Sequence, residues 1–176
     1  DAARPALQAL ARAGVPLRLV SSKTRAEIEK LRLEIRNAHP FVVENGGAAF
    51  IPRRYFSQPL DGVFVRDGYG ILEWGTPYAR LVEALTAAAA ESNCPVTGFH
   101  NLSIEDVSEL TGLSIERATL AVEREYDEPF VVSHPHCAPR LVEAIERRGL
   151  RWTHGGRFHH ICGNNDKATA VTALTA

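Results

Sequence analysis

Hydrophobic residues in the first quarter of the chain alternate between helical spacing and short continuous runs. A stretch with helical spacing over residues 3–13 ends at Gly14, a residue typical of helix C-termini. An apolar run over 15–20 follows, and the apolar positions within 25–33 again have helical spacing. A second apolar run lies at 41–43. Helices and strands that alternate with short connections predict a parallel sheet covered by helices, which is an α/β fold.

The middle of the chain has a different pattern. Residues 48–51 can return as a hairpin strand after a Glu-Asn-Gly-Gly turn, and 77–92 is a strongly amphipathic helix with a proline in its first turn. Further strands are expected at 63–65, 95–99, 129–133, 150–154 and 157–161, and further helices from about 102, 113, 138 and 166. This α+β pattern interrupts the α/β pattern. We therefore expect an inserted domain over 48–155, with 1–47 and 156–176 as parts of the domain that receives it.

Composition excludes several classes of protein. The 176 residues, 45% of them hydrophobic, can form one domain of ordinary size or two small ones around a sizeable core. A net charge of −1 does not favour nucleic acid as a partner, and no apolar run is long enough to cross a membrane. The three cysteines have no Cys-x-x-Cys spacing, so we expect reduced thiols in a cytoplasmic protein. The chain has no methionine and starts abruptly at Asp1, so we expect an excerpt of a longer product.

The first candidate site follows the apolar run that ends at Val20. Ser21 and Ser22 can each donate a hydroxyl hydrogen bond, and Lys23 and Arg25 add positive charge. The backbone N–H groups and the dipole of a helix N-terminus favour an anion at this kind of turn. The stretch therefore predicts a phosphate site. Ser and Thr before a helix are also ordinary N-caps, and that interpretation stays open.

The second candidate site lies near the end of the chain. Gly155 and Gly156 mark a turn where the backbone can approach a ligand, and Arg157 offers a planar guanidinium for a carboxylate or phosphate. Lys167 lies at the start of the last expected helix, where the helix dipole disfavours a cation. A bound anion or an acidic side chain would compensate for this placement. The alternative is a solvated lysine beside an Asn-rich turn.

Five segments together resemble the mannosyl-3-phosphoglycerate phosphatases. These segments are Val-Ser-Ser-Lys-Thr-Arg (20–25), Phe-Val-Val-Glu-Asn-Gly-Gly (41–47), Arg-Glu-Tyr-Asp-Glu (124–128), Trp-Thr-His-Gly-Gly-Arg-Phe-His (152–159) and Asp-Lys (166–167). The family belongs to the haloacid dehalogenase-like superfamily, in the branch with a large α/β cap between its second and third motifs. The resemblance implies a Rossmann-like α/β core, incomplete in this chain, with an inserted α+β cap domain.

The resemblance also implies roles for individual residues. Ser21 falls on the second-motif hydroxyl that binds the phosphoryl group, and Lys167 falls on the third-motif lysine that stabilises the nucleophilic carboxylate and the transferring phosphoryl. The residues expected to bind substrate are Ser22, Lys23, Arg25, Glu44, Asn45, Gly46, Gly47, Glu125, His154, Gly155, Gly156 and Arg157. The implied reaction is Mg²⁺-dependent hydrolysis of a phosphorylated sugar or glycerate, such as mannosyl-3-phosphoglycerate, through an aspartyl-phosphate. The implied partner is a small molecule, and no oligomeric state is predicted.

Two motifs of the family have no counterpart in this sequence. The first, an Asp-x-Asp that supplies the nucleophile and the acid–base carboxylate, would lie upstream of Asp1, and the fourth, which completes the Mg²⁺ site, would lie beyond Ala176. We therefore expect the metal ligands to lie outside these residues and the chain alone to be inactive.

Two other interpretations remain open. One is a catalytically dead sugar-phosphate-binding fragment of the same fold. The other is a zinc-binding module, although the spacing of its residue types matches no closed structural site. Its candidate ligands are His134, His136, Cys137, His159, His160 and Cys162.

Overall fold

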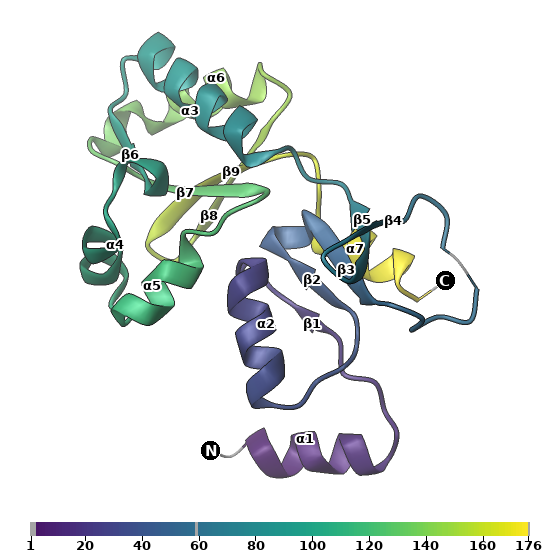
Figure 1. Ribbon diagram of the computed structural model, residues 1–176. Coiled ribbons are helices and arrows are strands. Elements are labelled where there is room, and N and C mark those ends of the chain that lie inside the picture. Colours follow the sequence, from purple (N-terminus) through teal and green to yellow (C-terminus); the bar gives the residue numbers. More distant parts are fainter. Residues whose placement is uncertain (1–2, 59, 176) are drawn as a thin grey trace.

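The computed structural model describes residues 3–58 and 60–175, which form two units that each contain a sheet (Figure 1). The first sheet has the strand order β1-β2-β3-β5-β4, in which β1 and β2 are parallel and the other neighbours are antiparallel. The elements of this unit are α1 (Ala3–Arg12), β1 (Leu19–Val20), α2 (Arg25–Glu34), β2 (Phe41–Val43), the 3₁₀ turn η1 (Glu44–Gly46), β3 (Ala48–Pro52), β4 (Phe64–Arg66), β5 (Tyr69–Glu73) and α7 (Lys167–Ala173).

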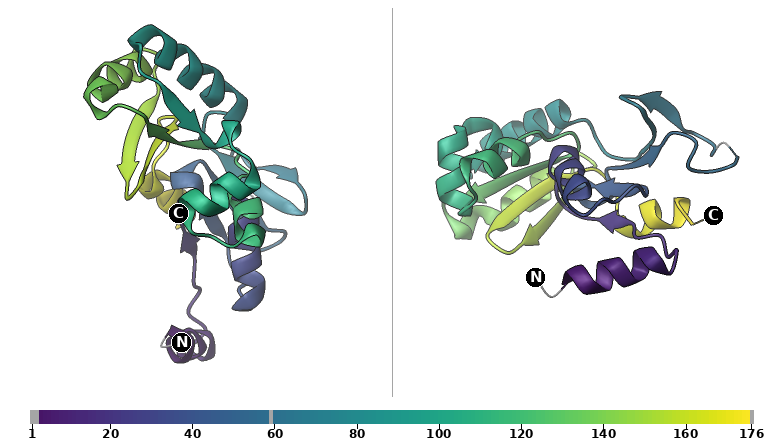
Figure 2. Two further views of the ribbon diagram at one scale, coloured as in Figure 1. Left: turned by 90° about the vertical axis from the view of Figure 1, so that its left-hand side faces the viewer. Right: turned by 60° about the horizontal axis from the view of Figure 1, so that its bottom comes forward.

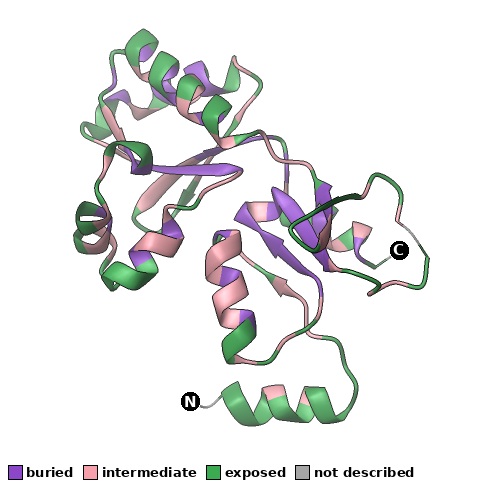
Figure 3. Cartoon of the chain, viewed as in Figure 1, coloured by how far each residue is buried: buried purple, intermediate pink, exposed green. Residues whose placement is uncertain are grey.

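Strand β2 is buried on both faces (Figure 3). Phe41 and Val43 belong to one apolar cluster with Ile28 of α2, and Val42 belongs to another with Ala170 of α7. A strand covered on both faces needs apolar side chains at every position, which explains the continuous apolar run at this point of the sequence. The predicted α/β fold class is confirmed, but the expectation of a parallel sheet holds only for β1 and β2, because β3, β4 and β5 pair antiparallel.

The second sheet has the order β6-β7-β9-β8 and is antiparallel throughout. One of its faces is covered by α3 and α6 (Figure 1). Leu81 and Leu141 of these helices pack with Phe130 and Ile161 of the sheet. The elements of this unit are α3 (Tyr78–Ser92), β6 (Val96–Gly98), η2 (Phe99–Asn101), α4 (Ile104–Thr111), α5 (Ile115–Ala121), β7 (Asp127–Val132), η3 (Pro135–Cys137), α6 (Ala138–Glu146), β8 (Arg151–Gly155) and β9 (Phe158–Cys162).

The strand pairing divides the chain at positions other than those expected. β3 pairs with β2, and β5 and β4 follow it, so residues 48–73 belong to the first unit. β9 pairs with β7, so residues 158–162 belong to the second unit. The chain therefore changes unit within 74–77 and 163–166, instead of at 48 and 156. A hairpin pattern shows that two strands pair with each other, but it does not identify the sheet that they join.

Helix α1 lies apart from both sheets (Figure 2). All of its residues are exposed or only partly buried, and Leu7 and Leu10 are the partly buried ones. Within residues 3–58 and 60–175, no helix combines the length and the apolar character needed to cross a membrane.

Two of the three cysteines are paired. Cys94, just after α3, forms a disulfide with Cys137, just before α6, and both are buried. The expectation of reduced thiols is wrong for this pair, because α3 and α6 pack on the same face of one sheet and bring together two residues that lie 43 positions apart. Cys162 of β9 is free and buried.

Candidate functional site

A cavity of about 590 Å³ lies between the two units. The first unit contributes the end of β1, the turn after β2 and the start of α7, and the second contributes one face of β8 and β9. The lining residues are Ser22, Asn45, Arg151, Thr153, His154, Gly155, His160, Cys162, Asn165, Asp166, Lys167 and Ala168.

The turn after β1 brings Ser22 to the cavity. Ser22 is exposed and lines it, whereas Ser21 is partly buried and does not. The carbonyl of Ser21 accepts a hydrogen bond from the N–H of Asn45 (3.1 Å), and its Oγ accepts one from the N–H of Lys23 (3.2 Å). The N-cap of α2 is the buried Thr24, which forms a capping box with Glu27. The ordinary capping role therefore belongs to Thr24, and neither serine serves as the cap.

The turn after β2 is held against the start of α7. Glu44 and Asn45 adopt positive φ angles of 43° and 58°, and Asn165 donates from Nδ2 to both of their carbonyls (3.4 and 3.3 Å). Gly46 also has a positive φ, and a Cβ there would lie 2.2 Å from the carbonyl oxygen of Asp166. This close packing explains the glycine, and it places Asn45 and Lys167 on the same cavity.

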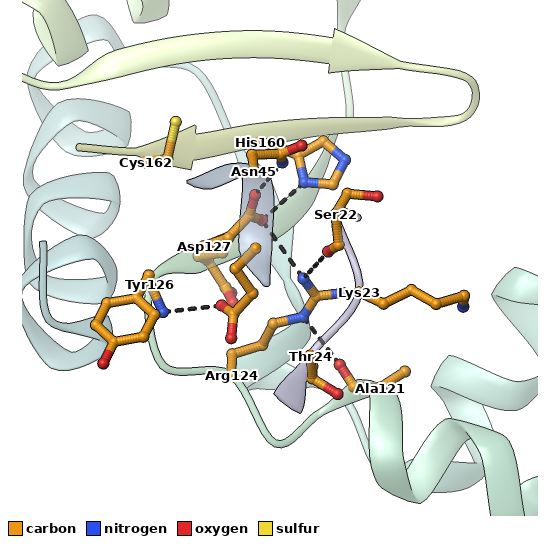
Figure 4. A network of polar contacts seen from close by, with 12 residues as sticks. Ser22, Lys23, Thr24, Asn45, Ala121, Arg124, Tyr126, Asp127, His160 and Cys162 are labelled. Carbon is orange, nitrogen blue, oxygen red and sulfur yellow. Dashed lines mark hydrogen bonds and ion pairs between the residues drawn. The ribbon is translucent and has the colours of Figure 1, made fainter. Parts of the chain in front are cut away.

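A buried carboxylate joins the two units beside the cavity (Figure 4). Asp127 accepts a hydrogen bond from Asn45 Nδ2 at Oδ2 (2.8 Å), and its Oδ1 lies 2.8 Å from Nδ1 of His160. The guanidinium of Arg124 lies 3.7 Å from Oδ1 and also donates to the carbonyl of Ser22 (3.1 Å). The charge of Asp127 is therefore compensated from both sides of the interface.

Glu44 makes a second connection between the units. Its carboxylate accepts hydrogen bonds from the backbone N–H groups of Glu125 (3.0 Å) and Tyr126 (2.8 Å). Burial raises the pKa of Glu44 to about 7, although the nearby Arg124 and the two N–H groups act in the opposite direction. The side chain has no exposed surface and does not line the cavity, so its placement does not support the expected contact with substrate.

Two cations in the cavity wall lack a partner within the protein. Neither the ammonium of Lys167 nor the guanidinium of Arg151 forms a hydrogen bond or ion pair with any residue that the structure describes. The one carboxylate of the lining, Asp166, accepts hydrogen bonds from the N–H and the hydroxyl of Thr169 (both 2.9 Å), which lower its pKa. The charge of Arg151 adds to this lowering of the pKa, so the two cations have no ion pair among the described residues but share the cavity with one carboxylate. A net positive charge remains available to an anion.

Cys162 also lines the cavity. Burial raises the pKa of its thiol to about 11, and Asp127 adds to the effect. Burial therefore favours the protonated thiol over the nucleophilic thiolate.

The structure brings only part of the predicted site together. The cavity gathers Ser22, Asn45, His154, Gly155 and Lys167. Several other charged candidates are engaged elsewhere, because Lys23 pairs with Glu27, Arg25 with Asp67 (2.9 Å), and Arg157 donates to the carbonyl of Leu110. The remaining expected residues that do not line the cavity are Glu125, Gly46, Gly47 and Gly156.

Sequence reasoning missed Arg151, and it considered His160 only as a zinc ligand. The signal that could have found both is strand alternation, since Arg151, Thr153 and Gly155 share one face of β8. The register places Thr153 opposite His160 and Arg151 opposite Cys162, so the corresponding face of β9 continues the same wall. Asp127 and Asn165 could not be found in this way, because each of them hydrogen-bonds to the turn after β2, which is far away in the sequence.

The described part of the chain contains no group of three or more His, Cys, Asp or Glu side chains that could hold a metal ion. The zinc interpretation also loses one of its candidate ligands, since Cys137 is in a disulfide.

Comparisons with known proteins identify the family. No protein-family model matches the sequence. The chain is 46% identical over 176 residues to a glucosyl-3-phosphoglycerate/mannosyl-3-phosphoglycerate phosphatase of Methanococcoides burtonii, with 99% of the chain but 65% of that relative covered, which is less than two thirds of its length. It is 35% identical to a mannosyl-3-phosphoglycerate phosphatase of Pyrococcus horikoshii, with 99% of the chain and 69% of the relative covered.

The fold has its counterpart among solved structures. A haloacid dehalogenase-like hydrolase from B. subtilis superimposes with a TM-score of 0.60 at 11% identity, over 97% of this chain and 70% of that one. The likeness confirms the predicted haloacid dehalogenase-like fold. Together with the sequence identities, it shows that this chain belongs to the mannosyl-3-phosphoglycerate phosphatase family.

Proposed function

We propose that the protein removes phosphate from a glycosyl-3-phosphoglycerate whose sugar is mannose or glucose. The observation that carries this proposal is the pair of unpartnered cations, Lys167 and Arg151, on one cavity between the units. Such a substrate has a phosphate monoester and a carboxylate, so it supplies two anionic groups for two free cations. The relatives named above act on substrates of this class by name, which supports the same assignment.

Lys167 is the residue that we assign to the phosphoryl group. Charge that develops on a phosphoryl group during transfer is stabilised best by fixed cations and hydrogen-bond donors. The hydroxyls of Ser21 and Ser22 can donate from the turn after β1, since Oγ of Ser21 already accepts from Lys23 and its hydrogen remains available. The guanidinium of Arg151 can hold the glycerate carboxylate through two parallel hydrogen bonds.

We assign the nucleophile and the Mg²⁺ ligands to segments that the longer relatives contain and this chain does not match. The described residues do not fit a magnesium site, because they include no cluster of three potential ligands and the cavity carboxylate Asp166 is occupied by Thr169. The contribution of this chain is therefore to bind and orient the anionic substrate. We also propose a cytoplasmic location, where a charged sugar phosphate would be retained.

The alternative of a catalytically dead fragment has little to favour it. The similarity to relatives named as phosphatases extends over 99% of the chain, and the cations that an active protein needs are present. A dead binding module would retain affinity for the substrate without releasing phosphate.

The test is phosphate release by the full-length protein in the presence of Mg²⁺. Mannosyl-3-phosphoglycerate and glucosyl-3-phosphoglycerate are compared with glucose 6-phosphate, which lacks the glycerate carboxylate. We expect kcat/KM for at least one glycosyl-3-phosphoglycerate to exceed that for glucose 6-phosphate by about 100-fold, because a bound carboxylate adds a charge-assisted contact. Absence of phosphate release from both glycosyl-3-phosphoglycerates would overturn the proposal.

A further inference from the structure

A buried aspartate–histidine pair lies in the cavity wall and has no part in the phosphoryl binding described above. Asp127 of β7 has no exposed surface, and the side chain of His160 of β9 is 15% exposed. Oδ1 of Asp127 lies 2.8 Å from Nδ1 of His160. The pair comes from neighbouring strands of the second sheet, so the fold holds it rigidly.

The surroundings of Asp127 determine which nitrogen of His160 carries the proton. Its Oδ2 accepts from the amide of Asn45 (2.8 Å), and the guanidinium of Arg124 lies beside Oδ1 (3.7 Å), so both neighbours favour the carboxylate form. A carboxylate only accepts hydrogen bonds, and Nδ1 of His160 must therefore donate. In the neutral ring this leaves Nε2 as an acceptor.

Nε2 of His160 is open to the cavity. No residue in the described part of the chain hydrogen-bonds to it, and a Cβ built on Gly155 would lie 3.9 Å away. Both residues line the cavity, so the missing side chain of Gly155 leaves space next to the free acceptor.

An acceptor at this place requires a ligand group that donates. A carboxylate carries no hydrogen at neutral pH, and an ionised phosphate is matched by Lys167 and Arg151, which are donors only. A hydroxyl can donate. His160 lies opposite Thr153, which is two residues from Arg151 along β8, a span of about 7 Å in an extended strand. The cavity wall therefore has a free hydrogen-bond acceptor next to Arg151 but displaced from it along β8.

From this geometry we propose that His160, held in its Nδ1–H form by Asp127, accepts a hydrogen bond from a hydroxyl of the glycosyl ring. His160 is then a specificity-determining residue, and Asp127 is a positioning residue that acts through it. The inference rests on the proposed function, since it assigns the sugar part of the same substrate. It predicts that recognition of the sugar can be lost while recognition of the phosphoglycerate part is kept.

The test compares His160→Phe, which keeps a ring of similar shape but has no acceptor, with His160→Gln, whose amide oxygen can accept. The control is His136→Phe, an exposed histidine of η3 whose ring stacks on His134. All are made in the full-length protein. KM and kcat are measured with the glycosyl-3-phosphoglycerate, and 3-phosphoglycerate, which has no sugar, is measured as a competitive inhibitor.

We expect His160→Phe to raise KM for the glycosyl substrate by about tenfold, the cost of one hydrogen bond, with kcat and the inhibition constant of 3-phosphoglycerate unchanged. His160→Gln should recover part of the loss. An equal weakening of substrate and inhibitor, or an unchanged KM in both variants, would overturn the inference. Thermal unfolding checks that each variant folds. If His160→Phe does not fold, His160→Gln still tests the inference, because its smaller rise in KM should again leave the inhibition constant of 3-phosphoglycerate unchanged.

If the proposed function is wrong, the unmodified protein releases no phosphate at all. This result distinguishes that failure from a failure of the inference about His160, which would leave phosphate release intact.

Discussion

Charged groups behave differently in two of the regions where the second unit meets the first. In one region, the end of α5 and the segment after it are joined to the first unit by hydrogen bonds. Thr24 Oγ1 donates to the carbonyl of Leu120 (2.7 Å), Arg124 donates to Ser22, and Glu44 accepts from the backbone of 125–126. In the other region, around the cavity, Arg151 and Lys167 form no ion pair with any residue that the structure describes.

The charged groups of the first region form hydrogen bonds and ion pairs within the protein, whereas the cations of the second region are available to a ligand. Lys23 and Arg25 lie in a family motif and carry the same charge as Lys167, yet each forms an ion pair within the protein. The electrostatic attraction between a cation and a bound anion is partly cancelled when the cation already has a carboxylate partner. The attraction is stronger when no such carboxylate lies nearby. Pairing, and not charge alone, therefore identifies the binding residues.

The largest expected effect is on turnover. In the full-length protein, Lys167→Ala should lower kcat by about 100- to 1,000-fold, because under the proposed function it removes the cation assigned to the transferring phosphoryl group. Thermal unfolding should change little, since Lys167 is exposed and has no partner among the described residues. Lys30→Ala is the matched control, because Lys30 pairs with Glu116 outside the cavity. Turnover that survives in Lys167→Ala would place the phosphoryl site elsewhere.

The second expected effect is on stability, and it tests the contact between the units at Glu44 through its pH dependence. The pKa of Glu44 is raised in the folded protein from 4.5 to about 7, so its contribution to the free energy of unfolding is fully present below about pH 4.5 and is lost as the pH rises through 7. The loss is roughly 3 kcal/mol at most. Glu44→Gln removes this titration, and the difference in stability between the two proteins should therefore change between pH 5 and 8.

Urea unfolding of the full-length protein at several pH values measures this difference. Glu34→Gln is the control, because Glu34 is exposed at the end of α2. Parallel pH profiles for the unmodified protein and Glu44→Gln would show that Glu44 does not titrate in this range.

The smallest expected effect is on binding. Arg151→Ala should raise KM by about tenfold to 100-fold, with a smaller change in kcat, because it removes a charge-assisted contact to the substrate carboxylate. Arg66→Ala is the matched comparison, since Arg66 pairs with Glu125 (2.7 Å) in a partly exposed ion pair. We expect it to change KM less than twofold and stability by less than about 1 kcal/mol. Equal effects of the two substitutions on KM would contradict the distinction between paired and unpaired cations.

Much of the fold could be predicted from local patterns. The apolar run of β2 and the helical spacing of α2 and α3 appear in the structure within a few residues of their expected bounds. The family followed from five short segments in order. The sheet that each hairpin joins could not be predicted, and neither could the pairing of Cys94 with Cys137, because both depend on contacts between residues far apart in sequence.

The candidate site was predictable in part for the same reason. Lys167 could be recognised because a cation at a helix start is locally unfavourable, and the turn at Asn45 because glycines follow it. No local feature of the sequence marks Arg151 as a binding residue. Arg157 is marked by the two glycines before it, but its guanidinium donates to a backbone carbonyl of α4 instead of lining the cavity.

By itself, the sequence determined most of the helices and strands, but not β5, and it determined the family and where hydroxyls, cations and glycines interrupt the apolar pattern. These properties depend on residues that are near neighbours in the chain. Only the tertiary structure decided that Asp127 meets His160 and Asn45 across 33 and 82 residues, and that Lys167 and Arg151 form no ion pair within the described residues. The physical reason is that the interaction energy of a charge depends on distance in space, and folding sets that distance independently of separation along the chain.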